Sequence, residues 1–400
     1  MCALGCDALG VDDEAVGCGF GESHLVAEAT GPLFHDLTLV ATAHGPAVIW
    51  SDRSGLFLRP LGPHGRPRGP ARRLGPACPG GVAGDAVGDA LDVACLRPAD
   101  RDRARPGGLT LLRVQGPRFD GARPHRLGET GPVGSESAGV DVVHHGGRVL
   151  VGWRDADVFT ARARVASLEG GAIERDPTPL STRGVLASAP SLHVVDGALL
   201  RAWTESWFDA RGAPTGHLLV QRDDGPPMPS LDVADVDVRV HLTADARGPI
   251  VAMRDRRPRG ARHRSFVGRL DERLALAERH LHSPARADAH GGRPMIVPCG
   301  DHVFSVATRR SSRQVTMVTL RRLDADLRPV EDEQQIYEYH ARFPQAVGLC
   351  VDDRLLVAVG ERQSEARREP RLRTYELRCG PGVEHERTPG TEGNARGRIR

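Results

Sequence analysis

The sequence contains no lysine and a single asparagine, Asn394, so all 54 of its basic side chains are arginines. This bias is typical of a very GC-rich genome, and the excess of arginine is therefore not read as a sign of phosphate recognition. With 52 acidic side chains the formal net charge is +2, which favours no nucleic-acid partner. Aromatic residues are also few, with nine Phe, three Tyr and four Trp, so the core must consist mainly of Val, Leu and Ala.

Long apolar runs are missing too: no stretch reaches the ~18 residues that a membrane-spanning helix needs. Near the amino terminus, Ala3-Leu4-Gly5-Cys6 resembles a bacterial lipobox, which implies a lipid anchor on Cys6 and a polar tether over residues 1–22. A basic stretch and an apolar run should precede such a cysteine, and only five residues do. The expectation is thus a cell-envelope lipoprotein of the periplasm or outer membrane, whose true start lies upstream. The alternative is a cytoplasmic chain that begins at Met1.

Long helices are not expected, because 47 glycines and 30 prolines interrupt the chain. What is present instead is a repeat. Its clearest unit is an apolar strand, a tight turn and a second apolar strand that ends in Trp-x-acid, followed by a third strand after a loop. Its copies recur at intervals of 45 to 58 residues, which suits four short strands plus loops. The repeat positions are Trp50, Cys95, Trp153, Trp203, Met253, Ala307 and Val359.

This pitch predicts an all-β fold, a seven-bladed β-propeller over residues 23–379, with a disordered tail at 380–400. If the irregular second copy is degenerate, six complete blades are the fallback. The last copy has only three strands, and residues 23–30 are the candidate for its fourth, so an amino-terminal strand would close the ring. We expect a monomer.

In its architecture the repeat resembles β-propellers of the broad kelch and sialidase-like kind. Gly146-Gly147 is a kelch-like glycine pair, and Ser51-Asp52-Arg53-Ser54-Gly55 is similar to the Asp-box turn of sialidases, although it is out of register and lacks the tryptophan. The resemblance therefore concerns the architecture and assigns no active site.

Strand parity predicts where a ligand would bind. With four strands in each blade, the ends of the second strands and the starts of the inner strands open on the same face. Acidic residues recur there with arginines between them, which could hold an anion or a sugar. In the alternative reading, each acid binds a loop amide or an arginine of the next blade. The candidate binding residues are His35, Asp36, Asp52, Asp155, Glu205, Trp207, Phe208, Asp255, His290 and Arg342.

The pair Trp207-Phe208 stands outside the periodic pattern, in a predicted loop over residues 204–216. Aromatic side chains in such a loop could stack on a sugar or anchor a protein partner. They could also plug the core beneath the loop. His144 and His145 cannot face the same side of a strand and are given no role.

The resemblance to sialidases raises a catalytic alternative, since retaining sialidases use a tyrosine nucleophile. Tyr337, Glu338 and Arg342 are the candidates, but three arginines for a substrate carboxylate cannot be assigned. The sequence therefore predicts a non-catalytic propeller that binds an unknown protein or glycan on the central-funnel face. A glycan-active hydrolase or lyase is the alternative.

Eight cysteines occur without a Cys-x-x-Cys pair. His280 and His282 would face the same side of a strand, but they lack a third fixed ligand, so neither a metal nor a cofactor is predicted. Cys299 and Cys350 occupy the same turn of neighbouring copies, and Cys78 and Cys95 bracket a short loop. In an exported chain either pair could form a disulfide. In the cytoplasm they would be buried thiols.

Overall fold

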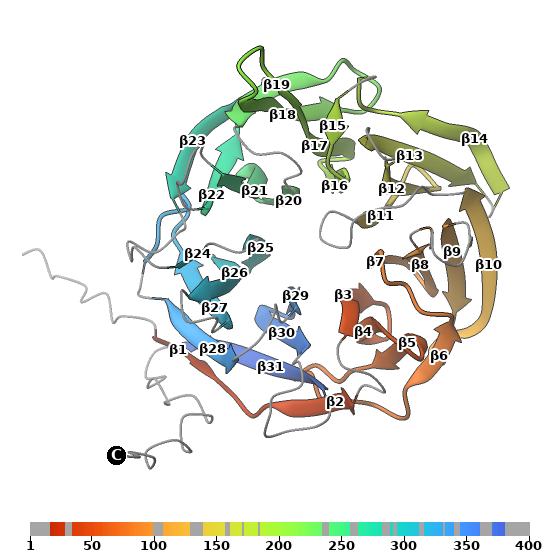
Figure 1. The fold of residues 1–400 in the computed structure, drawn as a ribbon. Helices are drawn as coiled ribbons and strands as arrows, with labels where there is room; N and C mark the ends of the chain where they lie inside the picture. The colour runs from red at the N-terminus through yellow and green to blue at the C-terminus, as the bar shows by residue number, and fades with distance from the viewer. Residues whose placement is uncertain are drawn as a thin grey trace, which may run out of the picture.

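The protein is described by a computed structural model in which seven antiparallel blades surround a central axis (Figure 1). The described residues are 17–28, 34–97, 99, 107–128, 139–156, 161–169, 172–182, 185–233, 240–256, 263–281, 289–290, 294–311, 316–330, 333–339, 345–360 and 370–380. The predicted seven-bladed propeller is thus confirmed, and the second copy forms a complete blade rather than a degenerate one. No helix among these residues is long and apolar enough to cross a membrane.

The strands are given from the inner to the outer edge of each blade. Blade 1 has β3 (Phe34–Thr42), β4 (Gly45–Asp52), β5 (Gly55–Pro60) and β6 (Arg72–Gly75). Blade 2 has β7 (Gly81–Val87), β8 (Ala90–Arg97), β9 (Gly108–Gln115) and β10 (Asp120–Gly128). Blade 3 has β11 (Val140–His145), β12 (Arg148–Ala156), β13 (Ala161–Glu169) and β14 (Ala172–Pro179). Blade 4 has β15 (Leu186–Ala187) and β16 (Ser191–Val195), then β17 (Ala198–Phe208), β18 (Pro214–Arg222) and β19 (Met228–Val233).

Blade 5 has β20 (Val240–Asp245), β21 (Gly248–Arg256), β22 (His263–Leu270) and β23 (Leu276–Leu281). Blade 6 has β24 (Ala289–His290) and β25 (Pro294–Cys299), then β26 (His302–Ser311), β27 (Thr316–Leu323) and β28 (Gln334–Tyr339). Blade 7 has β29 (Gln345–Val351), β30 (Arg354–Gly360) and β31 (Arg371–Gly380), with β1 (Gly17–Phe20) and β2 (His24–Glu28) as its outer edge.

The ring closes as predicted, because the amino-terminal strand supplies the outer strand of the last blade. Both β1 and β2 pair antiparallel with β31, so the two ends of the chain share one sheet. Closure begins at Gly17, six residues before the predicted start at 23, and Gly17–Phe20 is therefore blade rather than tether. A disulfide between Cys18 and Cys379, which the sequence did not indicate, links the paired strands covalently.

The core lies between the blades, where both faces of the second strands are covered. In β4, Val48 and Ile49 have no exposed surface and Trp50 is 2% exposed. This double burial explains why the repeat reads as a continuous apolar run instead of an alternating one. The repeated tryptophans Trp153 and Trp203 are buried in the same way.

Side chains of the inner strands also tie neighbouring blades together. The carboxylate of Asp141 in blade 3 accepts the Leu192 N–H of blade 4 at 2.9 Å. At the equivalent places, Ser191 Oγ accepts the Leu242 N–H and His241 Nδ1 accepts the Ile296 N–H. Each buried inner strand therefore finds a partner for a backbone donor that its own sheet leaves unpaired.

The turns between third and fourth strands place a large apolar side chain against the preceding blade. Phe119, Leu274 and Leu327 occupy this position with positive φ of 50°, 63° and 65°. All three are buried, at 4%, 6% and 1% exposure, in the cores shared with blades 1, 4 and 5. We call them the plug residues. Left-handed backbone is unfavourable for such side chains, so burial must offset the strain.

Candidate functional site

The candidate site is the face formed by the ends of the second strands and the starts of the inner strands, here called the funnel face. The backbone places Asp52, Asp155, Glu205 and Asp255 at the ends of β4, β12, β17 and β21, in agreement with strand parity. His290 lies in β24, which extends the inner strand of blade 6 toward this face. The side chains of Asp255 and His290, and all of Arg342, lie outside what the structure describes.

Asp52 serves the turn that follows it. Its Oδ1 accepts hydrogen bonds from the Ser54 N–H at 2.7 Å, the Ser54 hydroxyl at 2.6 Å and the Gly55 N–H at 3.3 Å. The residue is only 2% exposed. The structure thus gives Asp52 a role in its own turn, and its assignment as a binding residue stays a prediction.

Glu205 and Asp155 occupy equivalent places in blades 4 and 3 and also have protein partners. Glu205 Oε1 accepts the Thr182 N–H at 2.9 Å and the Trp203 Nε1–H at 3.2 Å. Asp155 pairs with Arg164 at 2.8 Å. The contact of Glu205 with the Thr182 N–H matches the alternative reading, in which each acid binds a loop amide or an arginine of the next blade. The contact of Asp155 differs from it, because Arg164 lies on β13 of the same blade.

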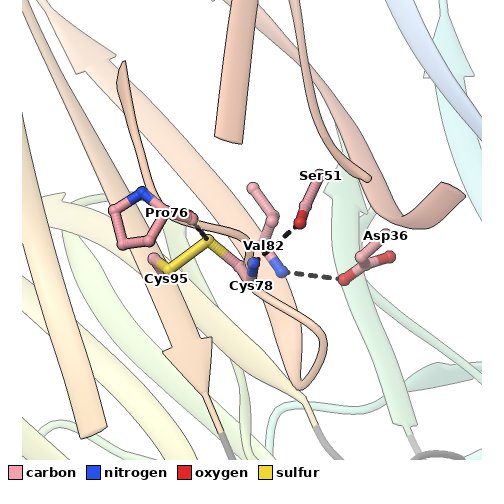
Figure 2. Close-up of a disulfide and its surroundings, with 6 residues drawn as sticks. All are labelled: Asp36, Ser51, Pro76, Cys78, Val82 and Cys95. Atoms are coloured by element: carbon pink, nitrogen blue, oxygen red, sulfur yellow. Dashed lines mark hydrogen bonds between the residues drawn. A yellow bond between two sulfur atoms is a disulfide. The ribbon is translucent and has the colours of Figure 1, made fainter. Parts of the chain in front are cut away.

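Asp36 is the fourth acid with an internal role (Figure 2). Its Oδ1 accepts the Leu37 N–H and its Oδ2 accepts the Val82 N–H of blade 2 at 2.8 Å. Nearby, Ser51 Oγ accepts the Cys78 N–H at 2.7 Å. Beside them, the main-chain oxygen of His35 accepts a hydrogen bond from the Gln345 amide of blade 7. These contacts make the start of β3 a joint between three blades.

Two predicted disulfides are formed. Cys78 is bonded to Cys95 in blade 2, beside the contacts of Ser51 and Asp36 (Figure 2). Cys299 is bonded to Cys350 and joins the inner strands of blades 6 and 7. Together with Cys18–Cys379, they make three disulfides among the described residues.

Trp207 and Phe208 do not belong to a loop, as the sequence suggested, but to the end of a long hairpin. β17 continues to Phe208 and pairs with β18 through Phe208↔Pro214. The indole of Trp207 packs edge-on against the His217 ring at 5.2 Å, whereas Phe208 is 60% exposed. Phe208 is therefore the more exposed of the two rings, and the half-buried Trp207 links β17 to β18 through its contact with His217.

The hairpin depends on one glycine. A Cβ at Gly216 would lie 2.1 Å from the main-chain oxygen of Glu205, far inside van der Waals contact. Its tip is fixed by Asp209, whose Oδ1 accepts the N–H groups of Arg211 and Ala213. Phe208 consequently stands on a rigid element rather than on a mobile loop.

The catalytic candidates Tyr337 and Glu338 lie on β28, which is the outermost strand of blade 6. Figure 1 shows this strand at the perimeter of the ring, away from the central axis. The backbone therefore does not bring them to the funnel beside Asp36, and their side chains are outside the description.

The sequence missed a buried charge network on the opposite face, which involves His144. Asp92 has no exposed surface and receives a bidentate contact from Arg113, with Nη2 to Oδ2 at 2.7 Å. His144 lies between two carboxylates, 2.9 Å from Asp85 through Nδ1 and 2.9 Å from Asp92 through Nε2. Its assignment to no role is thus wrong, because only the fold brings the two acids of blade 2 beside blade 3.

The electrostatics of this network follow from its contacts. Burial opposes charge on His144, but its hydrogen bonds to Asp85 and Asp92 outweigh burial and raise its pKa to about 9. Burial likewise works against charge on Asp92, and the bonds from His144 and Arg113 nevertheless hold its pKa below the usual value. The histidine is therefore a cation at neutral pH.

Comparison with known proteins finds similarity in structure at low sequence identity. No protein-family model and no curated protein matches the sequence. Among solved structures, a neuraminidase-like protein of A/flat-faced bat/Peru is 11% identical, with a TM-score of 0.45 over 92% of this chain and 96% of that chain. The α-L-arabinofuranosidase of Fusarium graminearum in complex with an iminosugar inhibitor is 9% identical, with a TM-score of 0.42 over 74% and 91%.

A thermostable family-43 glycoside hydrolase is 11% identical, with a TM-score of 0.36 over 63% of this chain and 95% of that chain. The chain is thus similar, at TM-scores below 0.5, to a neuraminidase-like protein and to glycoside hydrolases. At this distance the similarity concerns the fold and carries no argument about activity.

Proposed function

We propose that the protein is an exported, non-catalytic binding propeller that holds a carbohydrate on its funnel face, with Phe208 as the contact that anchors the ligand. The observation that carries the proposal is the 60% exposure of Phe208 on a hairpin braced by Trp207 and Gly216. An aromatic ring on a rigid strand loses little conformational entropy when a ligand covers it.

The chemistry around the ring supports a sugar as the ligand. Asp209 and Arg211 follow Phe208 in the tip of the hairpin, and both are exposed. A flat apolar ring with charged hydrogen-bonding groups beside it can stack on one face of a pyranose while binding its hydroxyls. The acids of the second-strand ends contribute less, because Asp52, Asp155 and Glu205 already have protein partners.

The proposal includes export of the protein. The lipid anchor on Cys6 is the part of the proposal that rests on the sequence. Support comes from the three disulfides, since reducing compartments keep cysteines as thiols. Fractionation of cells that express the protein from its full upstream reading frame, with metabolic lipid labelling, tests this part. A lipid label that is lost in Cys6→Ser supports the anchor, and an unlabelled cytoplasmic protein contradicts it.

Binding and catalysis are separated by one paired experiment. The labelled protein is applied to a glycan array, and the same preparation is incubated with a panel of aryl glycosides that includes sialosides and arabinofuranosides. The proposal expects retention of a defined group of glycans with no release of the aryl group. Turnover of any member of the panel would instead establish a glycan-active enzyme. Absence of any bound glycan would favour a protein ligand.

A further inference from the structure

Neighbouring inner strands are linked by one recurring contact, in which a side chain of one blade accepts a main-chain N–H of the next blade. We call these the inner-strand contacts. From blade 1 to blade 6 the acceptor is an oxygen or a nitrogen atom at each of the five junctions. The acceptors and their amides are Asp36 with Val82 at 2.8 Å, Asp85 with His144 at 2.7 Å, Asp141 with Leu192 at 2.9 Å, Ser191 with Leu242 at 3.1 Å and His241 with Ile296 at 3.3 Å.

The junction between blades 6 and 7 has a weaker acceptor. There the Gly348 N–H lies 3.3 Å from Sδ of Met295. A thioether sulfur is a poorer hydrogen-bond acceptor than a carboxylate, a hydroxyl or an imidazole nitrogen. The two strands nevertheless run close together, since a Cβ at Gly348 would lie 2.8 Å from Cγ2 of Val297 in blade 6. A tightly packed junction thus has the weakest of the inner-strand contacts.

A disulfide links the same two strands. Cys299 is the last residue of β25, and Cys350 is the last but one of β29. The two strands are neighbours beside the central axis (Figure 1). Among the described residues, Cys299–Cys350 is the one disulfide that joins two blades, because the other two each connect segments of a single blade. The covalent bond therefore lies at the junction where the hydrogen bond is weakest.

This disulfide is also more accessible than the one in blade 2. Cys350 is half-buried, whereas Cys78 and Cys95 are 0% and 3% exposed. Thiol–disulfide exchange begins when a thiolate attacks one sulfur atom of the bond, so its rate depends on access. A small dithiol is therefore expected to reduce Cys299–Cys350 in the folded protein before it reduces Cys78–Cys95.

From the weak acceptor, the disulfide between the same strands and its partial exposure, we propose that Cys299–Cys350 is a redox-sensitive latch that holds blade 7 against blade 6. Reduction by a dithiol breaks the S–S bond and leaves a thiol on each cysteine. The dithiol supplies the two electrons and two protons and itself becomes a disulfide. The junction between blades 6 and 7 then loosens while the other inner-strand contacts remain, and Thr374 still binds Gly65 of blade 1. The latch does not depend on the proposed glycan binding.

The test measures hydrogen exchange by mass spectrometry in peptides that cover β29 and β16, in the full chain with and without dithiothreitol. β16 is the internal control, because its Leu192 N–H has a carboxylate acceptor. Cys299→Ser/Cys350→Ser removes the latch, and Cys78→Ser/Cys95→Ser is the matched control that removes a disulfide elsewhere. Alkylation of free thiols identifies the disulfides that the reductant has opened.

We expect dithiothreitol to accelerate exchange in β29 of the wild type at least about tenfold, and exchange in β16 less than about twofold. In Cys299→Ser/Cys350→Ser, β29 should already exchange fast, and the reductant should add less than about twofold. Cys78→Ser/Cys95→Ser should respond as the wild type does. The proposal is overturned if Cys299 and Cys350 resist alkylation in the folded protein, if β29 stays protected without the disulfide, or if β29 and β16 accelerate together.

Discussion

Nε2 of His144 lies 2.9 Å from the carboxylate of Asp92, a side chain that no solvent reaches. With Asp85 on its other nitrogen, the ring joins two acids of blade 2 to the inner strand of blade 3. Arg113 also pairs with Asp92, but a neutral imidazole has a single N–H, so His144 can donate to both carboxylates only while it is protonated.

The stability of the protein should therefore fall between neutral and alkaline pH. The pKa of His144 rises from 6.5 to about 9 on folding, so its stabilisation is complete below about pH 6.5 and is lost as the pH rises through 9. Urea unfolding at pH 6, 7, 8 and 9 should show a decline on the order of 2 to 3 kcal/mol. In His144→Gln the decline should be absent. His145→Gln, at the partly exposed neighbour, should keep it.

A reciprocal exchange tests the partners of the repeated tryptophans. Trp203 Nε1 donates to Glu205, two residues further along the chain. At the equivalent place in blade 3 this residue is the shorter Asp155, and Trp153 Nε1 is buried with no hydrogen-bond partner in the described structure. Glu205→Asp should lower the free energy of unfolding by about 1 to 3 kcal/mol, because a buried donor loses its acceptor. Asp155→Glu should raise it by about 1 kcal/mol. Equal effects of one sign in both variants would refute this explanation.

The ring-closing disulfide should contribute more to stability than the local one. Cys18–Cys379 spans 361 residues and Cys78–Cys95 spans 17. Chain entropy then gives contributions of about 6 and about 3 kcal/mol. Chemical unfolding of Cys18→Ser/Cys379→Ser should show a larger loss than Cys78→Ser/Cys95→Ser. A smaller or equal loss would indicate that pairing of β1 and β2 with β31 already closes the ring.

Gly216 should be essential to the hairpin that carries Phe208. In Gly216→Ala the added methyl group meets the main-chain oxygen of Glu205, so β17 and β18 must separate. We expect faster amide hydrogen exchange over 204–218 and a melting temperature lower by several degrees. Thr215→Ala, one residue away, should leave both quantities near their wild-type values. Unchanged exchange in Gly216→Ala would mean that the strands can part without disrupting the hairpin.

The architecture could be predicted from the sequence because its signal is repeated. Second strands buried on both faces need apolar runs, and Trp153 and Trp203 recur at one spacing, so the number of blades and the closing strand follow. The four-strand count of each blade also predicted that the ends of the second strands lie on one face. These features depend on the order of strands along the chain, and that order can be read from one sequence.

The roles of individual side chains could not be predicted in the same way. The carboxylate of Asp52 accepts hydrogen bonds from its own turn. The carboxylate of Asp92 instead pairs with His144 of another blade, 52 residues away. Both are acids near the ends of strands, and nothing in their neighbours distinguishes them. The Trp207 and Phe208 pair was singled out by composition, while which ring is free depends on the register of β17 with β18.

The most direct test of the binding account compares Phe208→Asp with Val87→Asp on a glycan array. Val87, the last residue of β7, is 56% exposed on the opposite face and is thus a matched apolar position outside the proposed site. The account predicts that Phe208→Asp abolishes retention of the glycans that the wild type binds, that Val87→Asp retains them, and that both variants unfold within about 1 kcal/mol of the wild type. Retention by Phe208→Asp, or a loss of several kcal/mol in its stability, would contradict the account.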